Sequence, residues 1–292
     1  MTATLRHRLA ERGVDRTLWL LAPAVAFAVA LFCYPFLYGL QLSFAPRSGG
    51  GPFANYARFL SEPYLRDTVW TTLAISLPAT LINVLASVPI AYVMRGKMRG
   101  KRLLTTILVV PITLGTVLTA QGLIMYGGPA GWLNKALRGI GLIDAPLPLI
   151  HNYTGVLLSL VITGFPFAFL LTTSYLSGID PSLERAAATL GAGWWQRFRR
   201  ITLPLLAPGL AITFCLSFVM AFSVFPSAQL VGDPAGSTRV ISIAAYDAAF
   251  QEYDYSMGSA IAMIMAVVML VIIGLVMAWR ASLYRGATGG KG

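Results

Sequence analysis

The sequence predicts an all-α integral membrane protein with about six transmembrane helices. Three observations support this class: the composition, the hydropathy and the placement of the charges. Of the 292 residues, 57% are hydrophobic and only 11% are charged, and the mean hydropathy is +0.71. A soluble domain carries about 25% charged residues. The chain therefore lacks the polar surface that an ordinary water-soluble domain needs.

Six apolar runs each provide the roughly 20 residues that a helix needs to cross a hydrocarbon core. None of them contains Asp, Glu, Lys or Arg. We expect an N-terminal tail over 1–17, a six-helix domain over 18–283 and a C-terminal tail over 284–292. The runs are Leu18–Phe44, Val69–Met94, Leu103–Tyr126, Thr154–Leu176, Leu203–Pro226 and Met257–Trp279.

The first apolar run differs from a secretory signal peptide, although a basic segment precedes it. It is longer than the roughly 7–15 residues of a signal-peptide apolar region. It also continues through Tyr34 and Pro35 without a clear cleavage site. We expect a retained helix.

The basic residues predict the orientation of the chain. Sixteen of the 22 lie in the two tails and in the second and fourth loops, and six lie in the other loops. Because Lys and Arg are enriched in cytoplasmic loops, both termini are expected in the cytoplasm. The net charge of +11 is explained by topology, so we expect no nucleic-acid partner.

Groups that would carry chemistry are missing from the sequence pattern. There is no phosphate-binding G-x-x-x-x-G-K-[ST] loop, and His7, His151, Cys33 and Cys215 show no catalytic or metal spacing. We expect no enzyme, no metal and no cofactor in this chain. The membrane runs also lack the charged residues that ion-coupled pumps usually carry. A separate subunit is therefore expected to supply the energy.

The fourth loop, 178–204, has an unusual pattern for a connector. Asp180 or Ser182 can cap a short helix, Pro181 suits its first turn, and Gly191 can end it with a left-handed turn. A second, amphipathic segment rich in Trp and Arg follows. Such a surface helix can dock into a groove on a soluble partner, and the alternative is a generic interfacial loop.

The motif Ala186-Ala187, followed by Gly191 and then by Ile201-Thr202-Leu203-Pro204, resembles the "EAA" loop of ABC importer permeases. In that family the loop's short helix seats in a cleft of the ATPase. The resemblance implies a type I importer transmembrane fold and a coupling role for eight positions. These are Glu184, Arg185, Ala186, Ala187, Gly191, Ile201, Leu203 and Pro204.

One position departs from the family pattern. The family's Glu falls on Arg185, and Glu184 stands one place earlier. Either the ATPase cleft carries a compensating acid opposite Arg185, or Glu184 takes the contact instead. The small residues Ala186, Ala187 and Gly191 are less affected, because their role depends on size and backbone shape.

The resemblance also implies the assembly: ABC ATPase subunits that bind ATP and Mg, a second permease, an extracytoplasmic binding protein and a bacterial inner membrane. Gly131-Trp132-Leu133-Asn134 and Leu190-Gly191-Ala192 resemble spermidine/putrescine-type permeases, whereas Gly232-Asp233-Pro234 resembles the sugar permeases. We therefore expect a polyamine or related small ion as cargo, with sugar as the alternative. A secondary transporter, a channel, a membrane enzyme and a scaffold are the rival classes.

Polar side chains inside the apolar runs are the candidates for the translocation path. Each of them can instead form a hydrogen bond between helices. With no charge in the membrane runs, we expect a weak, passing site. The candidates are Asn83, Ser87, Thr116, Thr119, Gln121, Thr163, Thr213 and Ser223.

Overall fold

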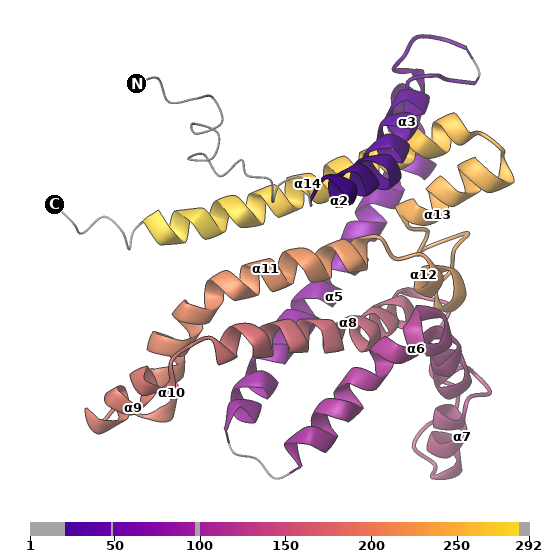
Figure 1. The fold of residues 1–292 in the computed structure, drawn as a ribbon. Helices are drawn as coiled ribbons and strands as arrows, with labels where there is room; N and C mark the ends of the chain where they lie inside the picture. The colour runs from indigo at the N-terminus through magenta and orange to yellow at the C-terminus, as the bar shows by residue number, and fades with distance from the viewer. Residues whose placement is uncertain (1–20, 48, 97–99, 286–292) are drawn as a thin grey trace, which may run out of the picture.

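The computed structural model describes residues 21–47, 49–96 and 100–285, and the regular elements in these ranges are all helical (Figure 1). Six segments are long and apolar enough to cross a membrane, which confirms the predicted class and number of spans. The predicted tail 1–17 lies outside the described residues, as does 286–292 of the predicted tail 284–292, whose first two residues belong to the last helix. The spans are α2 (Ala22–Ala28) with η2 (Val29–Cys33) and α3 (Tyr34–Ser43), then α5 (Pro63–Arg95), α6 (Lys101–Gly127), α8 (Tyr153–Ser177), α11 (Leu203–Phe222) and α14 (Tyr255–Arg285).

Short helices cover the two ends of the bundle. In Figure 1, α9 and α10 lie at the end where α5 passes to α6, and α7, α12 and α13 lie at the opposite end. The short elements are α4 (Ala54–Ser61), α7 (Trp132–Gly139), α9 (Pro181–Thr189), α10 (Trp194–Arg197), η3 (Phe198–Thr202), α12 (Pro226–Val231), α13 (Ile241–Tyr246) and η4 (Asp247–Gln251). Of these, η3 and η4 are π-helical, as is η2 of the first span.

The core of the bundle is formed by α5, α8 and α11, which pack against one another. Two buried polar contacts join α5 to α8. The hydroxyls of Ser87 and Thr172 lie 2.7 Å apart, and the Asn83 amide donates to the carbonyl of Leu160 at 3.2 Å. Because an unpaired polar group is costly in hydrocarbon, these bonds favour one packing of the two helices.

Two apolar runs are interrupted in ways that hydropathy does not predict. The fifth run was expected to continue to Pro226, but α11 ends at Phe222 and Pro226 begins α12. Proline is favoured in the first turn of a helix, where its missing N–H is not needed. In α6 the helix breaks at Gly115, with φ 72° and ψ 174°, a conformation that glycine adopts at little cost.

Three spans carry little buried surface. The most apolar stretches of the α2–α3 span, of α6 and of α14 are 0%, 6% and 11% buried, against 50% for the span that contains α11. Their outward side chains are large and apolar, such as Phe32, Leu118 and Leu270. Such a surface needs lipid or another subunit around it.

Candidate functional site

The helix α9 forms where the sequence predicts it. The Asp180 carboxylate accepts a hydrogen bond from the backbone N–H of Ser182 at 2.8 Å, and Pro181 occupies the first turn. The bonds from Ser182 hold the pKa of Asp180 below its usual range. The helix is followed by Gly191 with φ +82°, the predicted left-handed turn. Local sequence signals are therefore sufficient to define this surface helix.

The chain then returns to the membrane through an aromatic elbow. The rings of Trp194 and Trp195 each stack on the ring of Phe198, and the three ring centroids lie 5.7–6.2 Å apart. The Phe198 ring also contacts that of Tyr92 of α5, with centroids 5.0 Å apart. The π-helical turn η3 leads directly into α11. The elbow thus packs against the end of α5 and connects α9 to α11 with no intervening irregular segment after Gly193.

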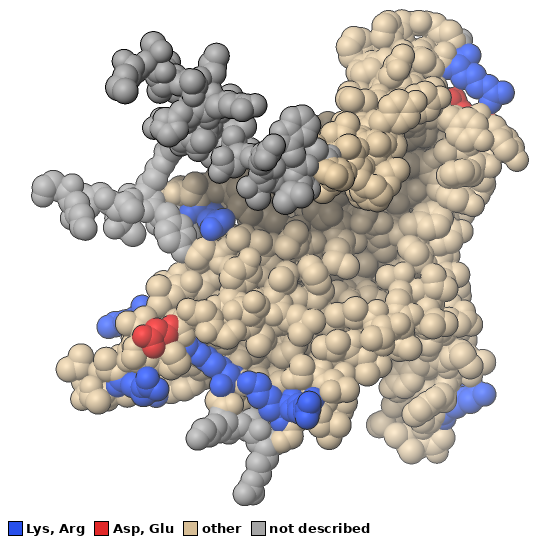
Figure 2. All heavy atoms as spheres, in the orientation of Figure 1, with Lys and Arg blue, Asp and Glu red and all other residues tan. Residues whose placement is uncertain are grey.

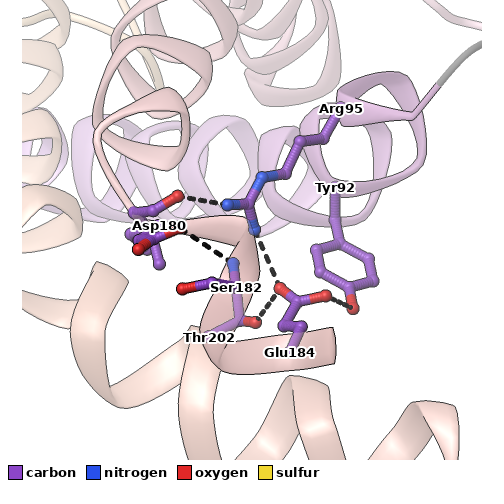
Figure 3. A network of polar contacts seen from close by, with 7 residues as sticks. Tyr92, Arg95, Asp180, Ser182, Glu184 and Thr202 are labelled. Carbon is purple, nitrogen blue, oxygen red and sulfur yellow. Dashed lines mark hydrogen bonds and ion pairs between the residues drawn. The ribbon is translucent and has the colours of Figure 1, made fainter. Parts of the chain in front are cut away.

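A four-residue network, which we call the clamp, fixes α9 to the membrane helices (Figure 3). One carboxylate oxygen of Glu184 accepts from the Arg95 guanidinium at 2.8 Å and from the Thr202 hydroxyl at 2.6 Å. The other accepts from the Tyr92 hydroxyl at 3.1 Å. Arg95 also donates to the carbonyl of Ile179. The clamp joins α9 to the last turns of α5 and to the turn before α11.

The clamp leaves Glu184 and Arg185 with different exposure and different pairing within this chain. The Glu184 side chain is 17% exposed, and both of its oxygens have donors within this chain. Arg185 is exposed and forms no ion pair with the described residues. Of the two alternatives, the geometry favours Arg185 as the group that faces outward, with Glu184 as an internal anchor.

The remaining loop positions divide between the surface and the packing. Ala186 and Gly191 are exposed, Ala187 is half-buried, and Leu190 beside them is 88% exposed. Ile201 and Leu203 are half-buried where η3 joins α11, and Pro204 is exposed. Leu190 directly follows the last residue of α9, so it lies at the C-terminal tip of this surface helix.

A cavity of about 500 Å³ lies between α5, α6, α8 and α11, and the loop after α11 completes it. Four of the eight predicted path residues line it: Asn83, Thr116, Thr163 and Ser223. The break in α6 at Gly115 and the preceding Pro111 are also at its wall.

The other four predicted residues lie outside this cavity. Ser87 bonds to Thr172, and Thr213 donates to the carbonyl of Gly209 at 2.9 Å, so both act within the helix packing. Thr119 donates to the carbonyl of Gly115, and Gln121 is exposed on α6. Side-chain polarity alone does not distinguish these positions from the lining residues.

The lining is apolar with a few hydrogen-bond acceptors. The Asn83 side-chain oxygen and the Ser217 hydroxyl are buried and without a partner among the described residues. The lining contains no Asp, Glu, Lys or Arg. The wall of the cavity is thus mostly apolar and carries no charged side chain. Sequence reasoning missed Ser217, because the packing of the helices decides that it lines the cavity. It also missed Arg95, Tyr92 and Thr202 of the clamp, because their partner Glu184 is distant along the chain.

We also searched the described part of the chain for side chains that could hold a metal ion. No group of three or more His, Cys, Asp or Glu side chains there could hold an ion.

Comparisons with known proteins identify the family. Residues 80–286 match the family described as binding-protein-dependent transport system inner membrane component. The chain is 32% identical over 219 residues to the spermidine/putrescine transport system permease protein PotB of Haemophilus influenzae, covering 72% of this chain and 76% of that protein. It is 27% identical over 279 residues to the trehalose/maltose transport system permease protein MalF of Thermococcus litoralis, covering 92% of this chain and 94% of that one.

The fold is similar to solved ABC importers. A chain in the crystal structure of a bacterial alginate ABC transporter, in complex with alginate pentasaccharide-bound periplasmic protein, superimposes with a TM-score of 0.79 at 22% identity. The match covers 96% of this chain and 98% of that chain. The family match, the relatives and the six-helix fold agree with one another. The chain belongs to the binding-protein-dependent ABC transporter permeases, and is a non-catalytic permease subunit of an importer of small solutes.

Proposed function

We propose that the solute crosses the membrane through the cavity between α5, α6, α8 and α11, and that α9 transmits the driving force from a separate ATPase. In this assembly a second, homologous permease completes the path, and an extracytoplasmic binding protein delivers the solute. Both termini and α9 lie in the cytoplasm of a bacterium, in agreement with the distribution of Lys and Arg.

The observation that carries this proposal is that the helices held by the clamp are also cavity helices. Along α5, Arg95 of the clamp and Asn83 of the cavity are separated by about 18 Å of helix. Along η3 and α11, Thr202 and Ser217 are separated by about 22 Å. A rigid movement of α9 therefore displaces two walls of the cavity together. ATP binding must favour one arrangement of these walls over the other for transport to be driven.

Among the described residues, the lining offers amide and hydroxyl groups but neither basic nor acidic side chains, so its charge does not distinguish a cation from an anion. The choice of cargo therefore rests on the relatives. The relationship to PotB supports a polyamine. We therefore propose a polyamine or a related small organic cation as the cargo.

A sugar is the second candidate, because its hydroxyl groups can form hydrogen bonds with such a lining. The relationship to the trehalose/maltose permease extends over 92% of the chain. The Gly232-Asp233-Pro234 segment forms an ordered turn in which the Asp233 carboxylate accepts from the backbone N–H of Ser237 at 3.1 Å. This turn lies at the end of the bundle where a binding protein is proposed to dock.

Uptake into vesicles tests the cargo and the path together. The chain is reconstituted with the ATPase, second permease and binding protein of its operon, and labelled spermidine, trehalose and sulfate are compared. We expect ATP-dependent uptake of spermidine, and slower uptake by Asn83→Leu than by Thr80→Val. Thr80 is a buried control on α5 that bonds to the carbonyl of Ser76 and does not line the cavity. Sulfate uptake, or equal rates for the two variants, would contradict the proposal.

A further inference from the structure

A buried arginine lies at the end of the bundle opposite the clamp, in the segment 239–247, which we call the strap. The strap contains α13 and the first residue of η4. On the face that Figure 2 shows, most of the visible Lys and Arg side chains gather at the end that carries α9, and few charged side chains are visible at the other end. Arg239 of the strap is only 8% exposed. Because a buried charge is costly unless it is paired, the contacts of this guanidinium indicate what it holds in place.

The Arg239 guanidinium lies between two partners, and we call these three residues the latch. Its Nη2 donates to the Asp247 carboxylate at 2.9 Å, which joins the two ends of the strap. Its Cζ lies 3.9 Å from the centroid of the Tyr64 ring, a cation–π contact to the first turn of α5. Its Nη1 is buried without a hydrogen-bond partner among the described residues. Asp247 therefore orients the guanidinium, and Tyr64 connects it to α5.

The strap packs against residues that form the wall of the cavity. The Ser242 hydroxyl donates to the carbonyl of Val224. Val240 and Ile243 are buried in one apolar cluster with Val224 and Leu160. Both Val224 and Leu160 line the cavity. The position of the strap therefore determines how this part of the cavity wall is supported.

We propose that Arg239 is a positioning residue for transport, and that the latch keeps the strap seated so that it restricts access to the cavity from the extracytoplasmic side. The latch is suited to release, because Tyr64 is 60% exposed and the unpaired Nη1 gains water when the guanidinium leaves its site. The inference rests on the proposed function, which takes the cavity as the path. Its test uses neither ATP nor solute, so its failure is distinguishable from a failure of the proposed function.

Hydrogen exchange of the full chain in detergent measures whether the latch holds the strap. Tyr64→Leu removes the ring, whereas Tyr64→Phe keeps the ring and its contact with the guanidinium. A cation–π contact changes an equilibrium constant between about twofold and about 30-fold, depending on its removal from water. We expect the peptides that cover 239–247 to exchange about tenfold faster in Tyr64→Leu, at least as fast in Arg239→Gln, and within twofold of the wild-type rate in Tyr64→Phe.

Thiol labelling in intact cells that express the operon measures access to the cavity. The reporter is Thr163→Cys, at a position that lines the cavity, and Cys33 and Cys215 are replaced by serine. A charged, membrane-impermeant maleimide is added outside the cells. We expect Tyr64→Leu and Arg239→Gln to raise the labelling rate about tenfold and Tyr64→Phe to leave it within twofold.

Two controls complete the experiment. Arg66→Gln removes a charge from the same end of α5, but Arg66 is 52% exposed, pairs with Asp67 at 3.5 Å and lies outside the latch, so exchange and labelling should not change. Leu142→Cys, at a 69% exposed position after α7, should label in every variant. Faster exchange of the strap with unchanged labelling of Thr163→Cys would overturn the proposal, because the latch would then be structural only. So would equal effects of Tyr64→Leu and Tyr64→Phe, or no labelling of Leu142→Cys from outside.

Discussion

Replacing Glu184 by Gln tests whether the clamp holds α9 in place. Glutamine keeps the size of the side chain and one acceptor oxygen, but it removes the charge that pairs with Arg95 at 2.8 Å. Both side chains are 17% exposed. The free energy of the pair should therefore lie between that of an exposed ion pair, up to about 1 kcal/mol, and the cost of breaking a buried one, about 3–5 kcal/mol. A loss of about 2 kcal/mol is expected from the charge-assisted bonds.

That loss has a measurable consequence for the loop. A change of about 2 kcal/mol shifts the balance between docked and released α9 by about 30-fold. Hydrogen exchange of the peptides that cover 178–204 should accelerate by up to that factor in Glu184→Gln. ATP-driven uptake should fall, because a released α9 no longer moves α5 and α11 together.

Glu62→Gln is the matched control for this experiment. Glu62 pairs with Arg58 at the same distance of 2.8 Å, but the two side chains are 46% and 44% exposed, and the pair lies outside the clamp. We expect exchange over 178–204 to be unchanged in this variant. An unchanged rate in Glu184→Gln, or an equal acceleration in Glu62→Gln, would refute the role given to the clamp.

Three further changes test the turn, the cavity and the cap. Gly191→Ala places a side chain at φ +82°, which costs about 1 kcal/mol and should lower uptake. Gly193→Ala should leave uptake unchanged, because Gly193 has φ −64° and open space around it. Equal uptake by the two variants would contradict this. Gly164→Ala puts a Cβ 2.5 Å from the Asn83 amide nitrogen and should slow uptake without changing exchange over 178–204. The pKa of Asp180 is lowered in the folded chain. The stabilisation that its ionised side chain gives to α9 is therefore fully present above the unfolded pKa of about 3.9, and it is lost as the pH falls through the folded pKa. Exchange over 178–204, corrected for its intrinsic pH dependence, should therefore stay level from pH 8 to pH 5, and a change in that range would argue against the cap.

Local signals in the sequence were enough to predict the spans and the form of α9. The six apolar runs, the cap at Asp180 and the turn at Gly191 each depend on residues close together in the chain, and the structure confirms them. Hydropathy alone placed the end of the fifth span wrongly at Pro226, because it does not register where the helical hydrogen bonds stop.

The clamp and the cavity depend on long-range contacts. Arg95 and Glu184 meet only because α5 and α9 end at the same side of the bundle, and in the sequence Arg95 was one of many basic residues beside an apolar run. In the same way, Asn83 lines the cavity whereas Ser87, one turn further along α5, faces Thr172 of α8. The register of packed helices decides between these positions.

The central claim is that the tip of α9 docks on a separate ATPase. Affinity purification of the tagged chain, expressed with its operon's ATPase, measures this directly in the wild type and in two leucine variants. Leu190, 88% exposed, lies at the tip of α9, and Leu142, 69% exposed, follows α7 at the other end of the bundle. The account predicts that the wild type and Leu142→Asp retain the ATPase and that Leu190→Asp loses it. Recovery of the wild-type chain without the ATPase, or retention of the ATPase by Leu190→Asp, would contradict it.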